Sequence, residues 1–213
     1  MPTTPTTIYL ARHGQSEWNN QALITGQTDV GLSDKGLAQA QAMAECLRDT
    51  RLDAIYVSAL RRTADTARPT AEAQGLTMQA LAALNEIHLG VLQGRRRDET
   101  DPEAQALWAQ WQADLWHFRV PGGERFDELA ERASTALQGI VQRHVGQQVL
   151  IVGHRATNRV LLGLLLGWPR ERWEELRLRN KYFYRVQLTQ PPRIDSYVLS
   201  GSKTGRLLDG FVM

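Results

Sequence analysis

The chain has 213 residues, 42% of them apolar and 23% charged, and a formal net charge of +2. This is the composition of a folded globular protein, and it excludes a disordered or fibrous chain. The small excess of basic residues contains no long basic block with interleaved aromatics, so we expect no nucleic-acid partner. A chain of this length is expected to form a single domain over residues 1–213.

The sequence gives no indication of a membrane or an oxidising compartment. Its longest apolar stretch, Val160 to Trp168, is far shorter than the roughly 20 residues that a membrane span needs. The first seven residues lack the basic and apolar parts of a signal peptide, and Cys46 is the only cysteine. We expect a soluble, cytoplasmic protein with no membrane partner. Its oligomeric state stays open, a homodimer included.

The first half of the chain predicts β-strands that alternate with helices. A β-prone run over 8–11 is followed by a helical pattern that reaches Leu47, and a second β-prone run over 54–57 leads into a helix that Gly75 ends. Residues 78–84 can form a third strand. This alternation favours a parallel sheet, because parallel neighbours need a crossover and the crossover is usually a helix.

The second half predicts longer helices around one buried strand. A helix is expected from Asp101 towards Phe118, and a second one from about Glu124 to His144. The continuous apolar run over 149–152 is typical of a central strand that is covered on both faces. A helix then follows as far as Gly167.

The tail predicts a short helix over 170–176 and two β-like pieces, 182–188 and 194–199, which we interpret as an edge hairpin. Together these elements predict a three-layer α/β/α fold with a mainly parallel central sheet. Residues 95–126 are expected to form a helical lid or insertion.

Three of the predicted strands end in side chains that can carry chemistry. Arg12 and His13 follow the first strand, Ser58 and Arg62 follow the second, and His154 follows the buried strand. Open α/β sheets bind ligands at the carboxyl ends of their strands. If these strands are parallel neighbours, all five residues belong to one site.

The first of these segments carries a resemblance. The triplet Arg12-His13-Gly14, with Glu17-Trp18-Asn19 behind it, resembles the signature of the histidine phosphatase superfamily, the phosphoglycerate-mutase-like proteins. The resemblance implies that His13 attacks phosphorus and is transiently phosphorylated. Three further segments follow in the family's order.

Residues 58–67 resemble the family's second motif, S-P-L-x-R-A-x-x-T-A, with Ala59 in place of Pro and Thr63 in place of Ala. The alignment identifies Arg62, and not Arg61, as the arginine that binds phosphate.

Residues 84–90 resemble the family segment that holds the acid carboxylate, which makes Glu86 that residue. Residues 151–154 match the segment of the second histidine, His154. Arg155 stands where many members have Gly, which puts in doubt the backbone contacts just after His154.

The resemblance also implies contacts to the phosphate or substrate. Asn19, Thr25 and Gly26 match loop positions that touch phosphate in relatives, and Arg155 lies beside the second histidine. Ser58 is interpreted equally well as a helix cap and as a residue that contacts the catalytic groups.

The chemistry of phosphoryl transfer explains these residue types. The nucleophile must be a neutral imidazole whose second nitrogen donates to a fixed acceptor, such as a loop carbonyl, and Arg12 and Arg62 would disfavour the charged form of His13. Forked arginine side chains, with His154 as a further donor, suit the phosphoryl oxygens. Glu86 would protonate the leaving alkoxide. The reaction then requires neither a metal nor a cofactor, and the sequence shows no Walker-type loop.

Three functions are compatible with these residues. We favour the phosphatase branch of the family: hydrolysis of a small phosphorylated metabolite by a phosphoric monoester hydrolase. The compact connection between Glu86 and His154 supports this interpretation, since mutases of the family usually carry a longer insertion there. The alternatives are a phosphoglycerate mutase that acts on 3-phosphoglycerate, primed by 2,3-bisphosphoglycerate, and a non-catalytic protein that binds a phosphorylated ligand.

Two further groups have an open role. The run Arg95–Arg97 is either a solvated surface or an entry for an anionic substrate. Trp108, Trp111 and Trp116 are interpreted mainly as core or lid, with substrate lining as the alternative. His88, His117 and His144 are expected at the surface or in packing.

Overall fold

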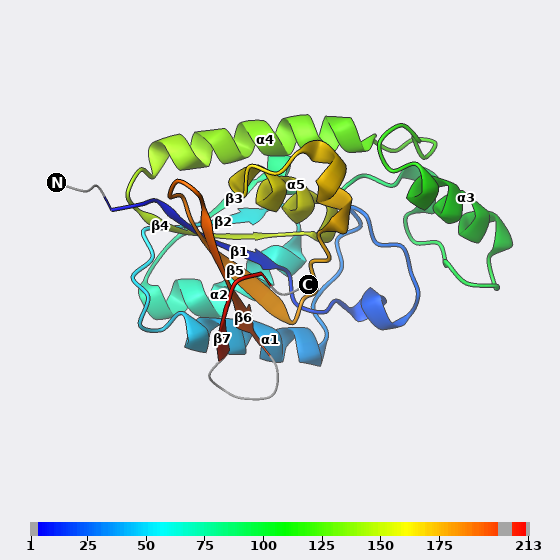
Figure 1. Ribbon diagram of the computed structural model, residues 1–213. Coiled ribbons are helices and arrows are strands. Elements are labelled where there is room, and N and C mark those ends of the chain that lie inside the picture. The colour runs from blue at the N-terminus through cyan, green and yellow to red at the C-terminus, as the bar shows by residue number, and fades with distance from the viewer. Residues whose placement is uncertain (1–3, 200–205, 212–213) are drawn as a thin grey trace.

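The computed structural model describes residues 4–199 and 206–211, and these contain a seven-stranded sheet with the order β3-β2-β4-β1-β5-β6-β7 (Figure 1). Four neighbouring strands are parallel: β1 (Thr7–Arg12), β2 (Ala54–Ser58), β3 (Met78–Leu81) and β4 (Gln148–Gly153). The other three extend the sheet in antiparallel fashion: β5 (Tyr182–Gln187), β6 (Arg193–Val198) and β7 (Arg206–Asp209).

Helices cover both faces of the sheet, and the pattern of the strands shows why. In β1, Ile8 and Leu10 belong to one core, which they share with α4 (Phe126–Arg143) and α5 (Arg155–Leu165). Tyr9 and Ala11 belong to the other core, with α1 (Asp34–Cys46) and α2 (Arg61–Gln74). Alternate residues of a strand point to opposite faces, so each parallel strand supplies both cores. The three-layer α/β/α prediction is confirmed.

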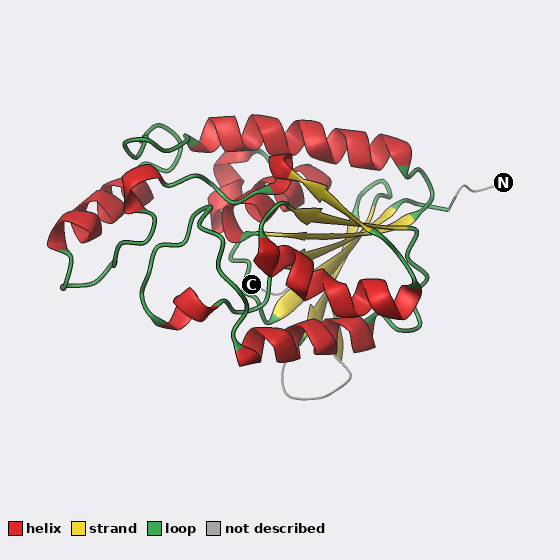
Figure 2. Ribbon diagram, turned by 180° about the vertical axis from the view of Figure 1, so that it is seen from behind, coloured by secondary structure: helices red, strands yellow, loops and turns green. Residues whose placement is uncertain are grey.

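The remaining helix, α3 (Pro102–Ala113), lies beyond the carboxyl ends of the parallel strands, away from the main layers (Figure 1, Figure 2). Short 3-10 turns complete the connections: η1 (Glu17–Asn20), η2 (Ala82–Leu84), η3 (Gly90–Leu92) and η4 (Arg170–Glu175). No helix in the part of the chain that the structure describes is both long and apolar enough to cross a membrane.

Two predicted element ends were wrong. The third strand stops at Leu81, because residues 82–84 turn into η2 and bury Leu84 completely. The helix expected to run towards Phe118 ends at Ala113. Asp114 then begins a turn in which its carboxylate accepts the backbone N–H of His117, at 3.2 Å. A side chain that bonds to nearby backbone in this way competes with helix formation.

The C-terminal hairpin was expected at an edge, and this was also wrong. β5 pairs with β1 on one side and with β6 on the other, so it is an interior strand. Phe183 and Val186 of β5 are fully buried, which explains the apolar side chains that the strand carries. The sheet therefore extends on both sides of β1, whose carboxyl end leads to His13.

Candidate active site

His13 is the first residue after β1, and the hydrogen bonds around it fix its position and the tautomer of its neutral ring. Its backbone N–H donates to the carbonyl oxygen of Gly153 at the end of β4, at 2.9 Å. Its ring Nδ1 lies 2.7 Å from the carbonyl oxygen of Gly14. A carbonyl oxygen only accepts, so Nδ1 carries the proton, and in the neutral ring the lone pair belongs to Nε2. The predicted contact to a loop carbonyl is present.

The surroundings of His13 keep its ring neutral. Burial lowers the pKa of His13 well below its ordinary value of 6.5, and the positive charges of Arg12 and Arg62 lower it further, while the Gly14 carbonyl opposes them. Only 4% of the residue is exposed. A free imidazole nitrogen is thus available at neutral pH in a strongly cationic environment.

The loop that follows His13 is clamped between α1 and α2. The backbone N–H of Gly14 donates to the Thr66 hydroxyl of α2 at 2.9 Å, and that of Gln15 donates to the Gln39 side chain of α1 at 2.8 Å. A Cβ atom on Gly14 would lie 2.6 Å from the carbonyl oxygen of Gly36, so this close approach requires glycine. The two helices of one layer therefore set the position of the His13 ring.

Arg62, in the first turn of α2, is almost fully buried and is held by three acceptors. Its Nη1 and Nη2 donate to the carbonyl oxygens of Thr28 and Gly26, both at 2.8 Å, and its Nε donates to His154 Nδ1 at 3.3 Å. Burial lowers the pKa of Arg62 to about 10, and Glu86 and Asp29 oppose this shift. The guanidinium stays charged at neutral pH, and each terminal nitrogen keeps a second N–H for a ligand.

Arg12, at the end of β1, has a donor without a partner. Its Nη1 donates to the carbonyl oxygen of Leu178 at 3.3 Å, whereas its Nε is buried and bonds to none of the described residues. Burial lowers the pKa of Arg12 to about 10; Arg155, Arg62 and Arg159 add to this effect, and Glu86 opposes it. A buried donor of this kind is satisfied when an anion enters the pocket.

His154, directly after β4, lies behind His13 and is fully buried. A guanidinium only donates, so the bond from Arg62 makes Nδ1 of His154 an acceptor, and its Nε2–H donates to Ser58 Oγ at 2.7 Å. The hydroxyl of Thr63 lies 2.9 Å from Ser58 Oγ and donates to the carbonyl oxygen of Leu60. Burial first, then Arg62, lowers the pKa of His154 well below 6.5.

The two histidine rings are close, with centroids 5.1 Å apart. Both ring nitrogens of His154 are nevertheless engaged by protein groups. As a donor to phosphate, the role expected of it, His154 would have to exchange one of these bonds. At Nδ1, His154 would have to lose the bond from Arg62 and gain a proton before it could donate.

Glu86 is fixed at the start of α5. Its carboxylate accepts the backbone N–H of Ala156 at 3.1 Å and that of Ile87 at 3.0 Å. Its own carbonyl oxygen accepts from Gln27 and from Arg132, at 2.9 and 3.0 Å. The carboxylate therefore has a defined position, and it opposes the lowered pKa values of Arg12 and Arg62.

These groups surround a pocket of about 270 Å³ at the carboxyl ends of the parallel strands. The structure brings eight of the ten predicted site residues to this pocket, and the other two, Ser58 and His154, lie behind its floor. The eight are Arg12, His13, Asn19, Thr25, Gly26, Arg62, Glu86 and Arg155.

Sequence reasoning missed two arginines that line the pocket, Arg159 and Arg177. Arg159 is one helical turn after Arg155, so their i, i+4 spacing on the predicted helix was a usable signal. Arg177 follows η4, and no pattern in the sequence placed that turn over the site. The other lining residues include Trp108, Trp111 and Leu115 from the α3 region.

The run Arg95–Arg97 divides between two roles. Arg95 pairs with Asp101 at 2.6 Å, and Arg96 pairs with Asp98 at 2.7 Å. Only Arg97 lines the pocket, and its guanidinium lies 5.9 Å from the ring centroid of Trp108. The aromatic group divides as well, because Trp116 packs against Phe126 in the core.

Comparison with known proteins agrees with this geometry. Residues 8–193 match the family model described as histidine phosphatase superfamily, branch 1. The chain belongs to the histidine phosphatase superfamily. This confirms the family that the four segments of sequence predicted, and the match covers all the candidate site residues.

Members of the superfamily that resemble this chain have different names. A probable phosphoglycerate mutase, GpmB, of Yersinia pestis is 36% identical over 189 residues, which cover 89% of this chain and 88% of that one. The structure of a mycobacterial glucosyl-3-phosphoglycerate phosphatase with VO3 has a TM-score of 0.78 and 29% identity, covering 92% of this chain and 99% of that one. A putative alpha-ribazole-5'-P phosphatase of Escherichia coli, 23% identical over 96% of this chain and 95% of that one, shares the fold, with a TM-score of 0.80.

Proposed function

We propose that this chain is a metal-independent phosphomonoesterase that hydrolyses a small phosphorylated metabolite through a phosphohistidine intermediate. One observation carries the proposal: the bond from Nδ1–H of His13 to the Gly14 carbonyl leaves the lone pair on Nε2, in a pocket where burial and the charges of Arg12 and Arg62 keep the ring neutral. The arginines supply the positive charge that the phosphoryl oxygens need, and they do so with no reorganisation during the reaction.

In the first step Nε2 of His13 attacks phosphorus and the bond to the leaving oxygen breaks. The leaving oxygen takes a proton from the carboxylic acid form of Glu86. Arg12 and Arg62 donate to the non-bridging oxygens, over which the negative charge is spread in the transition state. Nδ1–H of His13 keeps its bond to Gly14, so the positive charge on the phosphorylated ring remains stabilised by a carbonyl.

In the second step a water molecule attacks the phosphohistidine. Glu86, now a carboxylate, accepts a proton from this water as the new P–O bond forms and the P–N bond breaks. His13 returns to its neutral form and inorganic phosphate is released. The backbone donors of Ile87 and Ala156 hold the carboxylate in place through both steps.

Mutase activity is the second candidate, because the relative at 36% identity is named a probable phosphoglycerate mutase. The same phosphohistidine would then pass its phosphoryl group to an acceptor hydroxyl instead of to water. Phosphorus NMR of a reaction with 3-phosphoglycerate separates the two functions: inorganic phosphate indicates the phosphatase, and 2-phosphoglycerate indicates the mutase.

The central test is turnover of p-nitrophenyl phosphate in the presence of a chelator. We expect full activity in the wild type, a phosphoryl adduct on His13 by mass spectrometry of the quenched enzyme, and neither in His13→Ala. His117→Ala is the matched control, because the side chain of His117 is 86% exposed. Loss of activity with the chelator would refute metal independence. Full activity of His13→Ala would refute the mechanism.

A further inference from the structure

The pocket holds more positive charge than one phosphate group requires. Six arginines line it: Arg12, Arg62, Arg97, Arg155, Arg159 and Arg177. Only two carboxylates, Glu86 and Glu174, lie among the described lining residues. A phosphate monoester brings about −1.5 to −2 charges at neutral pH. Once it is bound, the six arginines, the two carboxylates and the phosphate leave a net charge of about +2 in the pocket.

Three of these arginines form a group of their own on the α5 side of the pocket. Arg155 and Arg159 are half-buried and four residues apart, so they share one face of α5. The Nε of Arg159 donates to the carbonyl oxygen of Leu176 at 3.0 Å, which brings the segment with Arg177 against the same face.

This group has no ion pair among the described residues, unlike arginines elsewhere in the protein. Arg132 pairs with Glu124 at 2.6 Å and Arg185 with Asp195 at 2.7 Å. The three pocket arginines instead repel one another. Burial lowers the pKa of Arg159 to about 10, and the charges of Arg155 and Arg177 add to this, while Glu86 and Glu174 oppose it. An anion that binds between these guanidinium groups would offset their mutual repulsion.

We propose that Arg155, Arg159 and Arg177 form a second-anion subsite, and that the substrate is a small phosphomonoester with a second anionic group, either a carboxylate or another phosphate. This inference rests on the proposed function, in which Arg12, Arg62 and His13 hold the reacting phosphate. A pocket of about 270 Å³ admits a small metabolite with both groups.

The test compares two pairs of compounds. 3-Phosphoglycerate differs from glycerol 3-phosphate in its carboxylate, and fructose 1,6-bisphosphate differs from fructose 6-phosphate in its second phosphate. We expect kcat/KM to be about tenfold or more higher for the member with the second anion in at least one pair, since a hydrogen bond to a charged group contributes that much. The pair that shows the preference identifies the anion.

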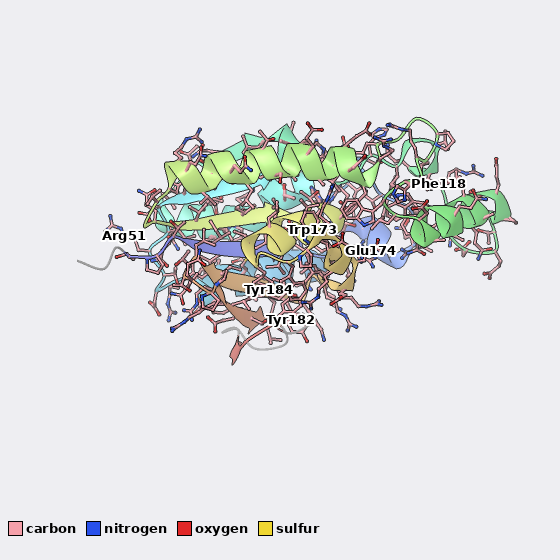
Figure 3. All side chains as sticks on the ribbon, turned by 45° about the horizontal axis from the view of Figure 1, so that its top comes forward. Arg51, Phe118, Trp173, Glu174, Tyr182 and Tyr184 are labelled. Carbon is pink, nitrogen blue, oxygen red and sulfur yellow. The ribbon has the colours of Figure 1, made fainter. Side chains whose placement is uncertain are left out.

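The ratio to follow is kcat/KM for the compound with the second anion divided by kcat/KM for its partner. In the double variant Arg159→Ala, Arg177→Ala we expect this ratio to fall close to one, mainly because KM rises for the compound with the second anion. Arg155→Gly should also lower it. Arg51→Ala is the matched control, because Arg51 is exposed and lies at one end of the molecule, away from Glu174 of the pocket lining (Figure 3). Its ratio should equal that of the wild type. If the double variant unfolds in a thermal melt, Arg177→Ala, at an exposed position, replaces it.

A wild-type ratio near one in both pairs, or a preference that survives the double variant, would overturn the inference. Failure to hydrolyse any of the four compounds would count against the proposed function instead. In that case isothermal titration calorimetry of the same four compounds with His13→Ala decides the inference separately: equal affinities within both pairs would refute the subsite.

Discussion

The floor and the wall of the pocket are built in different ways. On the floor, His13 and Arg62 are buried and held by backbone carbonyls, and His154 behind them is fixed from both ring nitrogens. On the wall, Arg155 and Arg177 have no ion pair among the described residues, and Arg177 is exposed. The difference indicates that the floor is preorganised for one chemical step, while the arginines of the wall are arranged to receive their counter-charge from the substrate.

The largest effect is expected from a substitution that alters the floor of the pocket but keeps its positive charge. Arg62→Lys retains a cation but loses the fork that reaches Thr28, Gly26 and His154. We expect kcat to fall about 10²- to 10³-fold, the loss typical of removing a preorganised donor. Steady-state kinetics with p-nitrophenyl phosphate measures it.

The neighbouring Arg61→Lys is the matched control for Arg62→Lys. The side chain of Arg61 is 69% exposed and pairs with Asp65, so its activity should equal that of the wild type. If the two variants lost activity equally, the sequence alignment that selects Arg62 would be wrong. The preorganised floor would then lose its main support.

Glu86→Gln tests the proton donor, with an effect that depends on the leaving group. An amide cannot donate the proton that an alkoxide needs, so we expect a loss of about 10²-fold or more with an alkyl phosphate. The loss should be smaller with p-nitrophenyl phosphate, whose leaving group needs no proton. Glu103→Gln, at a side chain that is 83% exposed, is the control. An equal loss with both substrates would contradict the acid role.

The structure shows how far the sequence could predict this site. The order of strands and motifs predicted that Arg12, Arg62 and His154 would converge on His13, because the carboxyl ends of parallel strands meet along one edge. The alternation of strands and helices, with the continuous apolar run over 149–152, also predicted that helices would cover both faces of the sheet, as the two cores show.

The remaining features depend on tertiary packing, which the sequence pattern does not encode. The position of Arg177 depends on how the turn after η4 packs against α5, through the bond from Arg159 to Leu176. His154 lies behind the pocket floor because its ring bonds to Ser58. The sequence motifs do not indicate which residue His154 bonds to. Similarly, the end of β3 depends on the burial of Leu84 and not on its β propensity.

The neutral histidines of the floor predict a pH dependence of stability. The folded pKa values of His13 and His154 lie well below 6.5, whereas the unfolded chain has the ordinary value. As the pH falls below 6.5, the unfolded state binds protons that the folded state does not, so the free energy of unfolding decreases. The slope is up to about 1.4 kcal/mol per pH unit for each histidine.

Chemical denaturation of wild type and His13→Asn between about pH 7.5 and 5.5, one unit either side of the ordinary histidine value, measures this slope. The variant lacks one of the two groups, so its stability should fall less steeply below pH 6.5 and run parallel to the wild type above it. Identical slopes for His13→Asn and the wild type would show that His13 titrates normally in the folded protein.

The smallest effect is expected on the aromatic part of the wall. Trp108 lines the pocket from α3, with its ring 4.9 Å from that of Trp111 and beneath the guanidinium of Arg97. Trp108→Ala removes contact area on the α3 side of the pocket and none of the groups proposed to react, so it should raise KM a few-fold and lower kcat less. Trp168→Ala, at a ring that contacts Arg172 outside this pocket, is the control. A fall in kcat larger than the rise in KM would mean that α3 positions the reacting groups. In that case α3 would belong with the floor residues that carry out the chemical step, and not with the residues that only bind the substrate.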